Sequence, residues 1–161
     1  MEILKLNPVL KDYIWGGERL KNDFGFESNL DKVAEGWMLS CHKDGKNTID
    51  GGEYDGQALD DVIEKIGKEK IVGTRSLDFP YFPVLIKLID AKDNLSIQVH
   101  PDNDYAQRVE RVNSAKRKYG MCLMQQTMHS LYTVLRMKSH PMNLKTQLKT
   151  IRLWMCSTAL R

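Results

Sequence analysis

Three polar side chains that could bind a metal ion alternate with apolar ones near the middle of the chain. Ser96, Gln98 and His100 stand two residues apart, and residues two apart in a β-strand point to the same face. An amide oxygen and an imidazole nitrogen are both competent zinc ligands, but a catalytic zinc usually has three protein ligands and a water. From alternation alone, a half-exposed strand with polar side chains in water is the more common explanation.

The neighbouring segments indicate how these side chains would be positioned. Residues 82–90 form an apolar run of strand length that contains Lys87, and residues 91–94 are a polar connection. Residues 95–100 then alternate and end at Pro101, which cannot donate to a strand ladder. This order predicts a hairpin or corner between two strands. By pattern alone, Lys87 is a strand lysine in solvent, and Asp102 and Asp104 belong to a turn.

The first 50 residues predict short strands and turns. Apolar pieces at 8–10 and 13–15 are followed by Gly16 and Gly17, and a further strand is expected at 37–41. Residues 50–52 (DGG) are a turn signal.

One short amphipathic helix is expected at about 57–68. Its apolar residues recur at helical spacing, with Gly67 and Gly73 as candidate stops. The recurring residues are Leu59, Val62, Ile63 and Ile66. A second helix is expected to begin within 105–110.

Composition places the chain among ordinary globular proteins. It has 161 residues, 42% hydrophobic and 28% charged, with no apolar run near the ~20 residues that span a bilayer. The first residues lack the pattern of a secretory signal, so we expect a cytoplasmic protein. The three cysteines are expected to be reduced, and Cys41 and His42 to be structural, because neighbours on a strand point to opposite faces.

Charge divides the chain sharply near residue 110. All 21 acidic residues lie in 1–110, beside 14 Lys and Arg, which gives that part a net charge of −7. Residues 111–161 contain ten Lys and Arg and no acidic residue, a net charge of +10, and six of the eight methionines. We therefore expect 1–110 to be one domain part and 111–161 a basic tail of different origin.

Longer motifs carry a family resemblance. Residues 83–91 (PVLIKLIDA) and 95–102 (LSIQVHPD) closely resemble the signature of type I phosphomannose isomerases. Residues 13–17 (YIWGG) resemble the family's opening W-G-G, and residues 35–37 (EGW) its E-x-W element. The resemblance covers about 1–110.

The resemblance implies a mainly β fold of the cupin, or jelly-roll, type, which is incomplete here. It also implies an aldose–ketose isomerase that interconverts mannose 6-phosphate and fructose 6-phosphate, with one zinc ion held by a glutamine, a histidine, a glutamate and a later histidine. Gln98 and His100 match the first two zinc ligands, Ser96 the serine associated with the substrate phosphate, and Lys87 a pocket lysine that becomes the candidate catalytic residue. The implied partner is a small sugar phosphate, with no membrane and no specific nucleic acid.

The family pattern breaks after residue 110. The family continues with G-K-T-E-x-W-Y, whose glutamate binds zinc, whereas residues 114–121 read SAKRKYGM. If the codons of 114–122 are regrouped by one base, they can encode Gly-Lys-Thr-Glu-Ile-Trp-Tyr-Val. We therefore interpret 111–161 as read out of frame, and expect a truncated product with an incomplete zinc site and little or no turnover.

Two other interpretations remain open. One is a non-catalytic cupin-like module that binds a sugar or a metal through Ser96, Gln98 and His100. The other is a small domain with a basic tail, since ten cations without acids bind phosphate backbones non-specifically. The basic residues form no ordered stripe, so we treat nucleic-acid affinity as incidental.

Overall fold

The computed structural model describes residues 3–95 together with Tyr105 and Arg108. The chain divides into two compact units, Met1–Ser96 and Ile97–Arg161, and the architecture below is that of the first unit. Tyr105 and Arg108 belong to the second unit and both are helical, in agreement with the helix expected to begin within 105–110.

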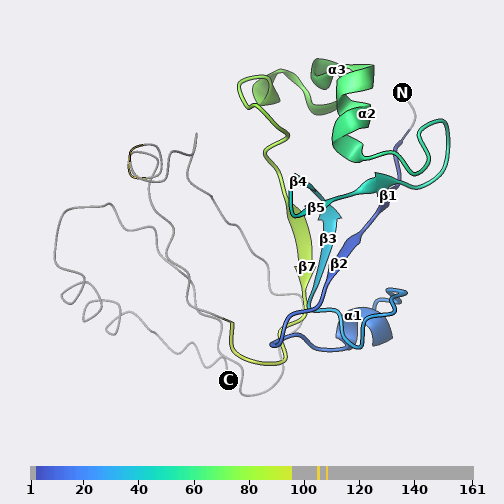
Figure 1. The fold of residues 1–161 in the computed structure, drawn as a ribbon, viewed down its shortest axis with the longest axis vertical. Helices are drawn as coiled ribbons and strands as arrows, with labels where there is room; N and C mark the ends of the chain where they lie inside the picture. The colour runs from blue at the N-terminus through green and yellow to red at the C-terminus, as the bar shows by residue number, and fades with distance from the viewer. Residues whose placement is uncertain (1–2, 96–104, 106–107, 109–161) are drawn as a thin grey trace, which may run out of the picture. The chain divides into compact units, whose positions relative to one another are not determined.

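A three-stranded antiparallel sheet forms the spine of the first unit (Figure 1). Its strands are β2 (Val9–Lys11), β3 (Glu35–Leu39) and β7 (Ile86–Ile89), with β3 in the centre. In the register, Trp37 lies opposite Val9 on one side and Lys87 on the other. The register between β3 and β7 is irregular between Trp37 and Leu39. The two ends of β3 therefore contact different parts of the molecule.

Two smaller strand pairs extend from this sheet. β1 (Leu6–Asn7) pairs with β6 (Thr48–Ile49), and β4 (Cys41–His42) pairs with β5 (Gly45–Lys46). The fully buried Asn47 joins these pieces, because its side-chain amide donates hydrogen bonds to the carbonyl oxygens of Asn7 (2.7 Å) and Trp37 (2.8 Å). These two bonds from one buried side-chain nitrogen fix β1 and β3 relative to each other, which such short strands would not do alone.

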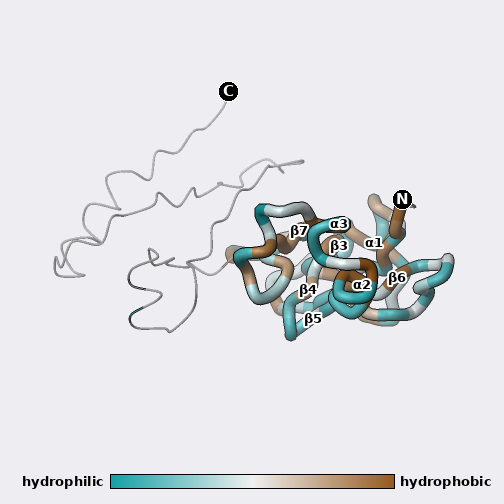
Figure 2. The backbone as a smooth tube through the Cα atoms, turned by 90° about the horizontal axis from the view of Figure 1, so that it is seen from above, coloured by the Kyte–Doolittle hydropathy of each residue, from teal (hydrophilic) through white to brown (hydrophobic). Residues whose placement is uncertain are grey.

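Helix α2 (Leu59–Ile66) is the amphipathic helix expected at 57–68, and it ends at Gly67, whose φ is 103°. It covers a cluster of buried side chains, called the apolar cluster below; its members are Cys41, Ile49, Leu59, Val62 and Ile63. Figure 2 shows hydrophobic and hydrophilic stretches mixed along this part of the chain, as expected for an amphipathic helix.

Further short helices accompany α2. They are α1 (Arg19–Asn22), α3 (Lys68–Val72), which ends at Gly73, and the 3-10 turn Thr74–Ser76. The expectation of one helix near 57–68 was therefore incomplete, because four- and five-residue helices leave too little periodicity in the sequence to be detected.

The strand expected at 13–15 is wrong. Ile14 and Trp15 form a turn, and Gly16 follows with an isolated bridge to Ala91. The turn is closed by a hydrogen bond from Gly16 N–H to Tyr13 O (2.8 Å). The apolar character of this piece does not reflect burial in a ladder, because Ile14 is 91% exposed and only Trp15 of the three residues is partly buried.

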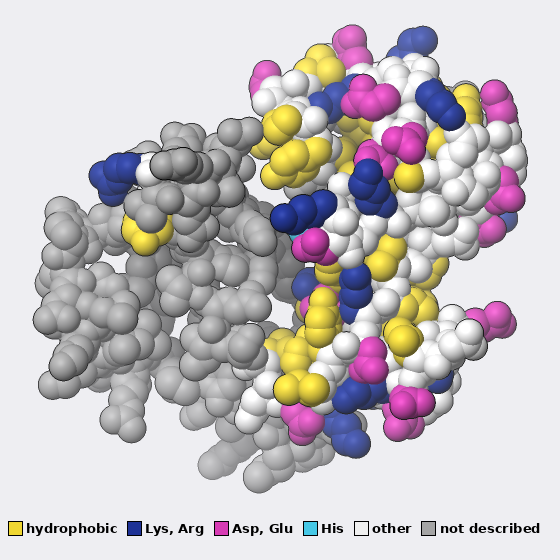
Figure 3. Space-filling view, in the orientation of Figure 1, with side chains coloured by type: hydrophobic (Ala, Val, Ile, Leu, Met, Phe, Trp, Pro, Cys, Tyr) yellow, Lys and Arg dark blue, Asp and Glu magenta, His cyan; other side chains and the backbone are white. Residues whose placement is uncertain are grey.

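The run at 82–90 forms a shorter strand than expected. Only Ile86–Ile89 pair with β3, while Phe82 packs against the apolar cluster instead. β7 is an outer strand of the described sheet, and Val84, Leu85, Ile86 and Ile89 are exposed. Hydrophobic side chains accordingly reach the surface in Figure 3. In the described part of the chain, no helix has the length and apolar character required to cross a membrane.

Candidate functional site

Of the side chains predicted to do chemistry, the structure places Lys87. It lies in β7, opposite Trp37 of β3. Ser96, Gln98 and His100, the predicted phosphate and zinc residues, lie outside the described residues. Among the residues that are described, no group of three or more His, Cys, Asp or Glu side chains could hold a metal ion. The zinc ligand set therefore stays a prediction.

Lys87 forms an ion pair with Glu35. Its Nζ lies 2.7 Å from Glu35 Oε1, and the pair joins β7 to β3 across 52 residues of sequence. The Glu35 side chain is 8% exposed and that of Lys87 is 26% exposed. The alternative that Lys87 is a lysine free in solvent is thus wrong, because a half-buried ammonium needs a partner such as this carboxylate.

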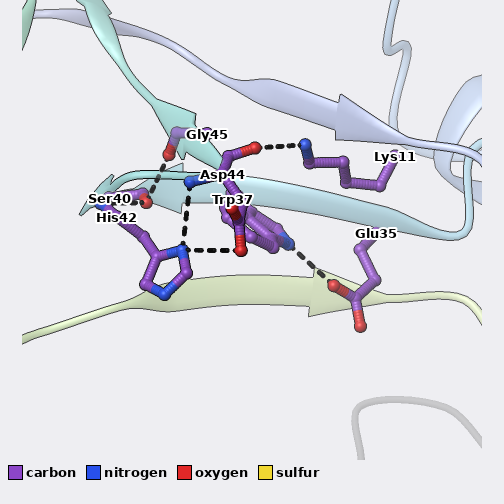
Figure 4. A network of polar contacts seen from close by, with 7 residues as sticks. All are labelled: Lys11, Glu35, Trp37, Ser40, His42, Asp44 and Gly45. Atoms are coloured by element: carbon purple, nitrogen blue, oxygen red, sulfur yellow. Dashed lines mark hydrogen bonds and ion pairs between the residues drawn. The ribbon is translucent and has the colours of Figure 1, made fainter.

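The second oxygen of Glu35 is held by Trp37. The Trp37 Nε1–H donates to Glu35 Oε2 at 2.7 Å, a contact visible in Figure 4. The two residues stand two apart in β3 and so share one face of the sheet. We call Glu35, Trp37 and Lys87 the polar face.

The indole of Trp37 is itself fixed from several sides. Lys11 Nζ lies 4.9 Å from its ring centroid and donates to the Asp44 carbonyl oxygen at 2.6 Å. His42 meets the ring edge-on with centroids 6.0 Å apart. The ring cannot rotate without disturbing these contacts, so its N–H is a fixed donor for Glu35.

Tyr13 adds a phenol to the same surroundings. Partial burial raises the pKa of Tyr13, and the carboxylates of Glu35 and Asp44 raise it further because they disfavour a phenolate. Tyr13 also stacks on Trp15 with ring centroids 5.4 Å apart. The Tyr13 ring of this aromatic pair therefore lies within electrostatic range of the Glu35 carboxylate.

The W-G-G element forms a corner that holds the end of β7. Gly17 N–H donates to Asp90 O (3.1 Å), and Asp90 Oδ2 accepts from Arg19 N–H (2.7 Å) at the start of α1. A Cβ on Gly16 would overlap Ala34, and a Cβ on Gly17 would overlap the Asp90 carboxylate. At Gly16 the backbone of Ala34 leaves no room for a side chain, whereas at Gly17 a side chain would require the Asp90 carboxylate to move away from the Arg19 N–H.

The corner also holds the connection that follows β7. The N–H groups of Lys92 and Asp93 both donate to the Trp15 carbonyl oxygen, at 3.0 and 3.1 Å. These residues lead directly into Leu95 and the predicted ligands. The W-G-G motif therefore fixes the backbone of the connection that precedes the predicted ligands in the sequence.

Cys41 and His42, predicted to be structural, have structural surroundings. Cys41 is a buried free thiol in the apolar cluster, and burial, followed by the nearby Asp60 carboxylate, raises its pKa to about 11. A thiol with so high a pKa is a poor nucleophile at neutral pH. His42 Nδ1 accepts from Asp44 N–H (3.2 Å) in the β4–β5 turn.

A family model described as "Phosphomannose isomerase type I, catalytic domain" matches residues 3–128. The chain belongs to this family. A probable mannose-6-phosphate isomerase of Bacillus subtilis is 39% identical over 113 residues, which cover 70% of this chain and 35% of that protein. A mannose-6-phosphate isomerase of Streptococcus mutans is 38% identical over 105 residues, covering 65% of this chain and 32% of that protein.

Solved structures agree with this assignment. The mannose 6-phosphate isomerase from Bacillus subtilis superposes with a TM-score of 0.59 at 36% identity, covering 67% of this chain and 33% of that chain. A mannose 6-phosphate isomerase bound with zinc and yttrium gives 0.55 at 30% identity, covering 65% and 26%. The expected mainly β, cupin-type fold is confirmed, and the chain spans about a third of the length of these relatives.

Sequence reasoning missed the role of Glu35. The motif match singled out the E-x-W element as a mark of the family and assigned no partner to its glutamate. A signal was present, because an acid flanked by apolar residues in a predicted strand has to be paired when it is buried. The identity of the partner depends on the register of β3 against β7, which the sequence does not state.

Proposed function

We propose that this chain is the N-terminal part of a zinc-dependent, cytoplasmic isomerase that interconverts mannose 6-phosphate and fructose 6-phosphate. The observation that carries the proposal is the family motif at 83–102, whose lysine, Lys87, stands half-buried on the sheet beside Glu35. The relatives named above as mannose-6-phosphate isomerases support the substrate.

Each proposed role follows the chemistry of the side chain. Gln98 and His100 would hold zinc, which when bound polarises a sugar carbonyl. Ser96 would donate a hydrogen bond to the substrate phosphate. Lys87 would contact the sugar and hold or move a proton as it passes between C1 and C2. Tyr13 and Trp15 would border the same space.

We further propose that the 161-residue polypeptide has little or no isomerase activity. Residues 111–161 contain no acidic side chain, so they offer no glutamate where the family places its third zinc ligand. With a one-base shift, the codons for 114–122 can encode that glutamate across positions 117 and 118, about 18 residues after His100. The nucleotide sequence around codon 110 tests this directly.

The decisive experiment compares two proteins. One is the 161-residue chain, and the other has the shifted frame restored and extended to the length of the relatives. Zinc content and mannose-6-phosphate isomerase activity are measured on both. We expect only the restored protein to retain zinc and turn over. Zinc retention and turnover by the 161-residue chain would refute the account of 111–161, and an inactive restored protein would refute the isomerase assignment.

A further inference from the structure

Glu35 occupies an unusual place for a carboxylate. It is buried in the central strand of the sheet, and each of its oxygens accepts a hydrogen bond from a different strand position. We propose that Glu35 is the positioning residue for Lys87, and that Trp37 fixes Glu35 in turn. This inference rests on the proposed function for the role of Lys87, but the ion pair itself is independent of it.

The geometry constrains the carboxylate at two points. Trp37 lies directly opposite Lys87 in the register, and Glu35 lies two residues along on the same face. Oε2 is fixed by the indole N–H and Oε1 receives Lys87 Nζ, both at 2.7 Å. Because both oxygens are engaged, rotation of the carboxylate would break one bond or the other. Lysine is long and has several rotatable bonds, so its ammonium stays in one place only if such an anchor holds it.

Lys87 keeps donor capacity beyond this contact. An ammonium carries three N–H groups, and in the described part of the chain Glu35 is the one acceptor within hydrogen-bond distance of Nζ. The side chain is 26% exposed, whereas Glu35 is almost sealed. Glu35 therefore holds the ammonium from the protein side while the remaining N–H groups stay accessible to a sugar oxygen.

Stability alone is a poor explanation of this arrangement. A buried ion pair contributes little to folding once desolvation is counted, and apolar side chains of similar volume serve as well. Here the supporting contacts all restrict the orientation of the Glu35 carboxylate. Lys11 and His42 fix the Trp37 ring, and the ring fixes Glu35. This is the pattern expected when a chain of contacts sets the position of one functional atom.

The first test measures the position of Lys87 without using catalysis. Reductive methylation of lysines, read by mass spectrometry, is followed on the 161-residue chain and on Glu35→Gln, Glu35→Asp and Trp37→Phe. We expect Lys87 to react several-fold faster in Glu35→Gln, with an intermediate rate in Trp37→Phe and partial rescue in Glu35→Asp. Glu53→Gln, which removes an exposed carboxylate, should leave the Lys87 rate unchanged. Exposed Lys92 provides the internal reference in every sample.

Unchanged Lys87 labelling in both Glu35→Gln and Trp37→Phe would overturn the proposal. If Glu35→Gln fails to fold, as judged by circular dichroism, Glu35→Asp and Trp37→Phe carry the same test, since each keeps part of the contact. Faster labelling of Lys92 as well as Lys87 would also overturn it, because the change would then be general loosening.

The second test uses the frame-restored protein and separates positioning from folding. We expect Glu35→Gln to lower kcat by roughly 10- to 100-fold, the loss typical of a misplaced functional group, with KM nearly unchanged. Equal changes in kcat for Glu35→Gln and Glu53→Gln would refute a positioning role. A restored protein that shows the labelling effect but no isomerase activity would refute the proposed function and leave the Glu35–Lys87 contact standing.

Discussion

The apolar cluster and the polar face share one strand but depend on different physics. β3 runs from Glu35 to Leu39 (Figure 1). Its first half carries Glu35 and Trp37 of the polar face, and its last residue, Leu39, packs against the apolar cluster beneath α2. The cluster excludes water from Ile49, Val62 and their neighbours, an effect that scales with apolar area and has no direction. The polar face depends on two 2.7 Å contacts to one carboxylate, which are lost after small displacements.

This difference indicates where substitutions should be tolerated. In the apolar cluster, the loss of unfolding free energy should increase with the side-chain volume removed and should change little with pH near neutrality. On the polar face, that loss should depend on which partner is left unpaired. The predictions below test that contrast.

The largest loss of unfolding free energy is expected for a substitution in the apolar cluster. Ile49→Ala removes a side chain that is 1% exposed and leaves a cavity, so the free energy of unfolding should fall by about 3 kcal/mol. Ile14→Ala is the matched control, because Ile14 is 91% exposed and its change should stay within about 0.5 kcal/mol. Urea titration followed by tryptophan fluorescence measures both. Similar losses for the two variants would mean that Ile49 does not anchor a core.

A substitution on the polar face should lower the unfolding free energy by less, and a second substitution should restore part of it. Lys87→Met leaves the Glu35 carboxylate without its cation, and we expect a fall of about 2 kcal/mol, reduced from the fully buried case by the partial exposure of Lys87. The double variant Glu35→Gln/Lys87→Met removes the unpaired charge and should be more stable than Lys87→Met alone. A double-mutant cycle on unfolding free energies measures the coupling. Strictly additive changes would contradict the ion pair.

The apolar cluster should become sensitive to pH only in alkali. Burial raises the pKa of the Cys41 thiol in the folded chain from its ordinary value of 9.0 to about 11. Between these values the unfolded thiol loses its proton while the folded thiol keeps it, so stability is full below pH 9 and falls as pH rises towards 11. The loss at pH 10 should be roughly 1 kcal/mol.

Comparison of Cys41→Ala with the parent chain isolates this contribution. Unfolding free energies at pH 8 and pH 10 should differ less for the variant than for the parent, because the other titrating groups are common to both. An equal difference for the two proteins would show that the Cys41 thiol is not protected by burial.

The smallest effect should come from an exposed ion pair between the first residue of α1 and Asp23, the residue that follows the helix. Arg19 Nε lies 2.8 Å from Asp23 Oδ2, and both side chains are more than a third exposed. Asp23→Asn should lower the unfolding free energy by about 0.3 kcal/mol, since surface pairs one helical turn apart are weak. Thermal melts at low and high salt measure it. A loss as large as that of Lys87→Met would remove the distinction between buried and exposed pairs.

Local signals in the sequence predicted much of this fold. The spacing of Leu59, Val62 and Ile63 predicted α2, and Gly67 and Gly73 were correctly expected to end helices. Alternation and apolar runs located the regions of β3 and β7. β7 is shorter than the apolar run at 82–90, because only Ile86–Ile89 have partners in β3. The four-residue helix α1 left no period that could be recognised.

The sequence by itself determined the family, through long motifs that need no partner in space to be recognised. It also drew attention to Lys87, Gln98 and His100 as chemically competent side chains. Only the tertiary structure decided what Lys87 touches and why a side chain at Gly16 would overlap Ala34. The physical reason is distance along the chain: Glu35 and Lys87 are 52 residues apart, and Gly17 meets Asp90 from a still greater separation. Such contacts depend on which distant strands pair and on close backbone approach, and no short stretch of the sequence shows either one by itself.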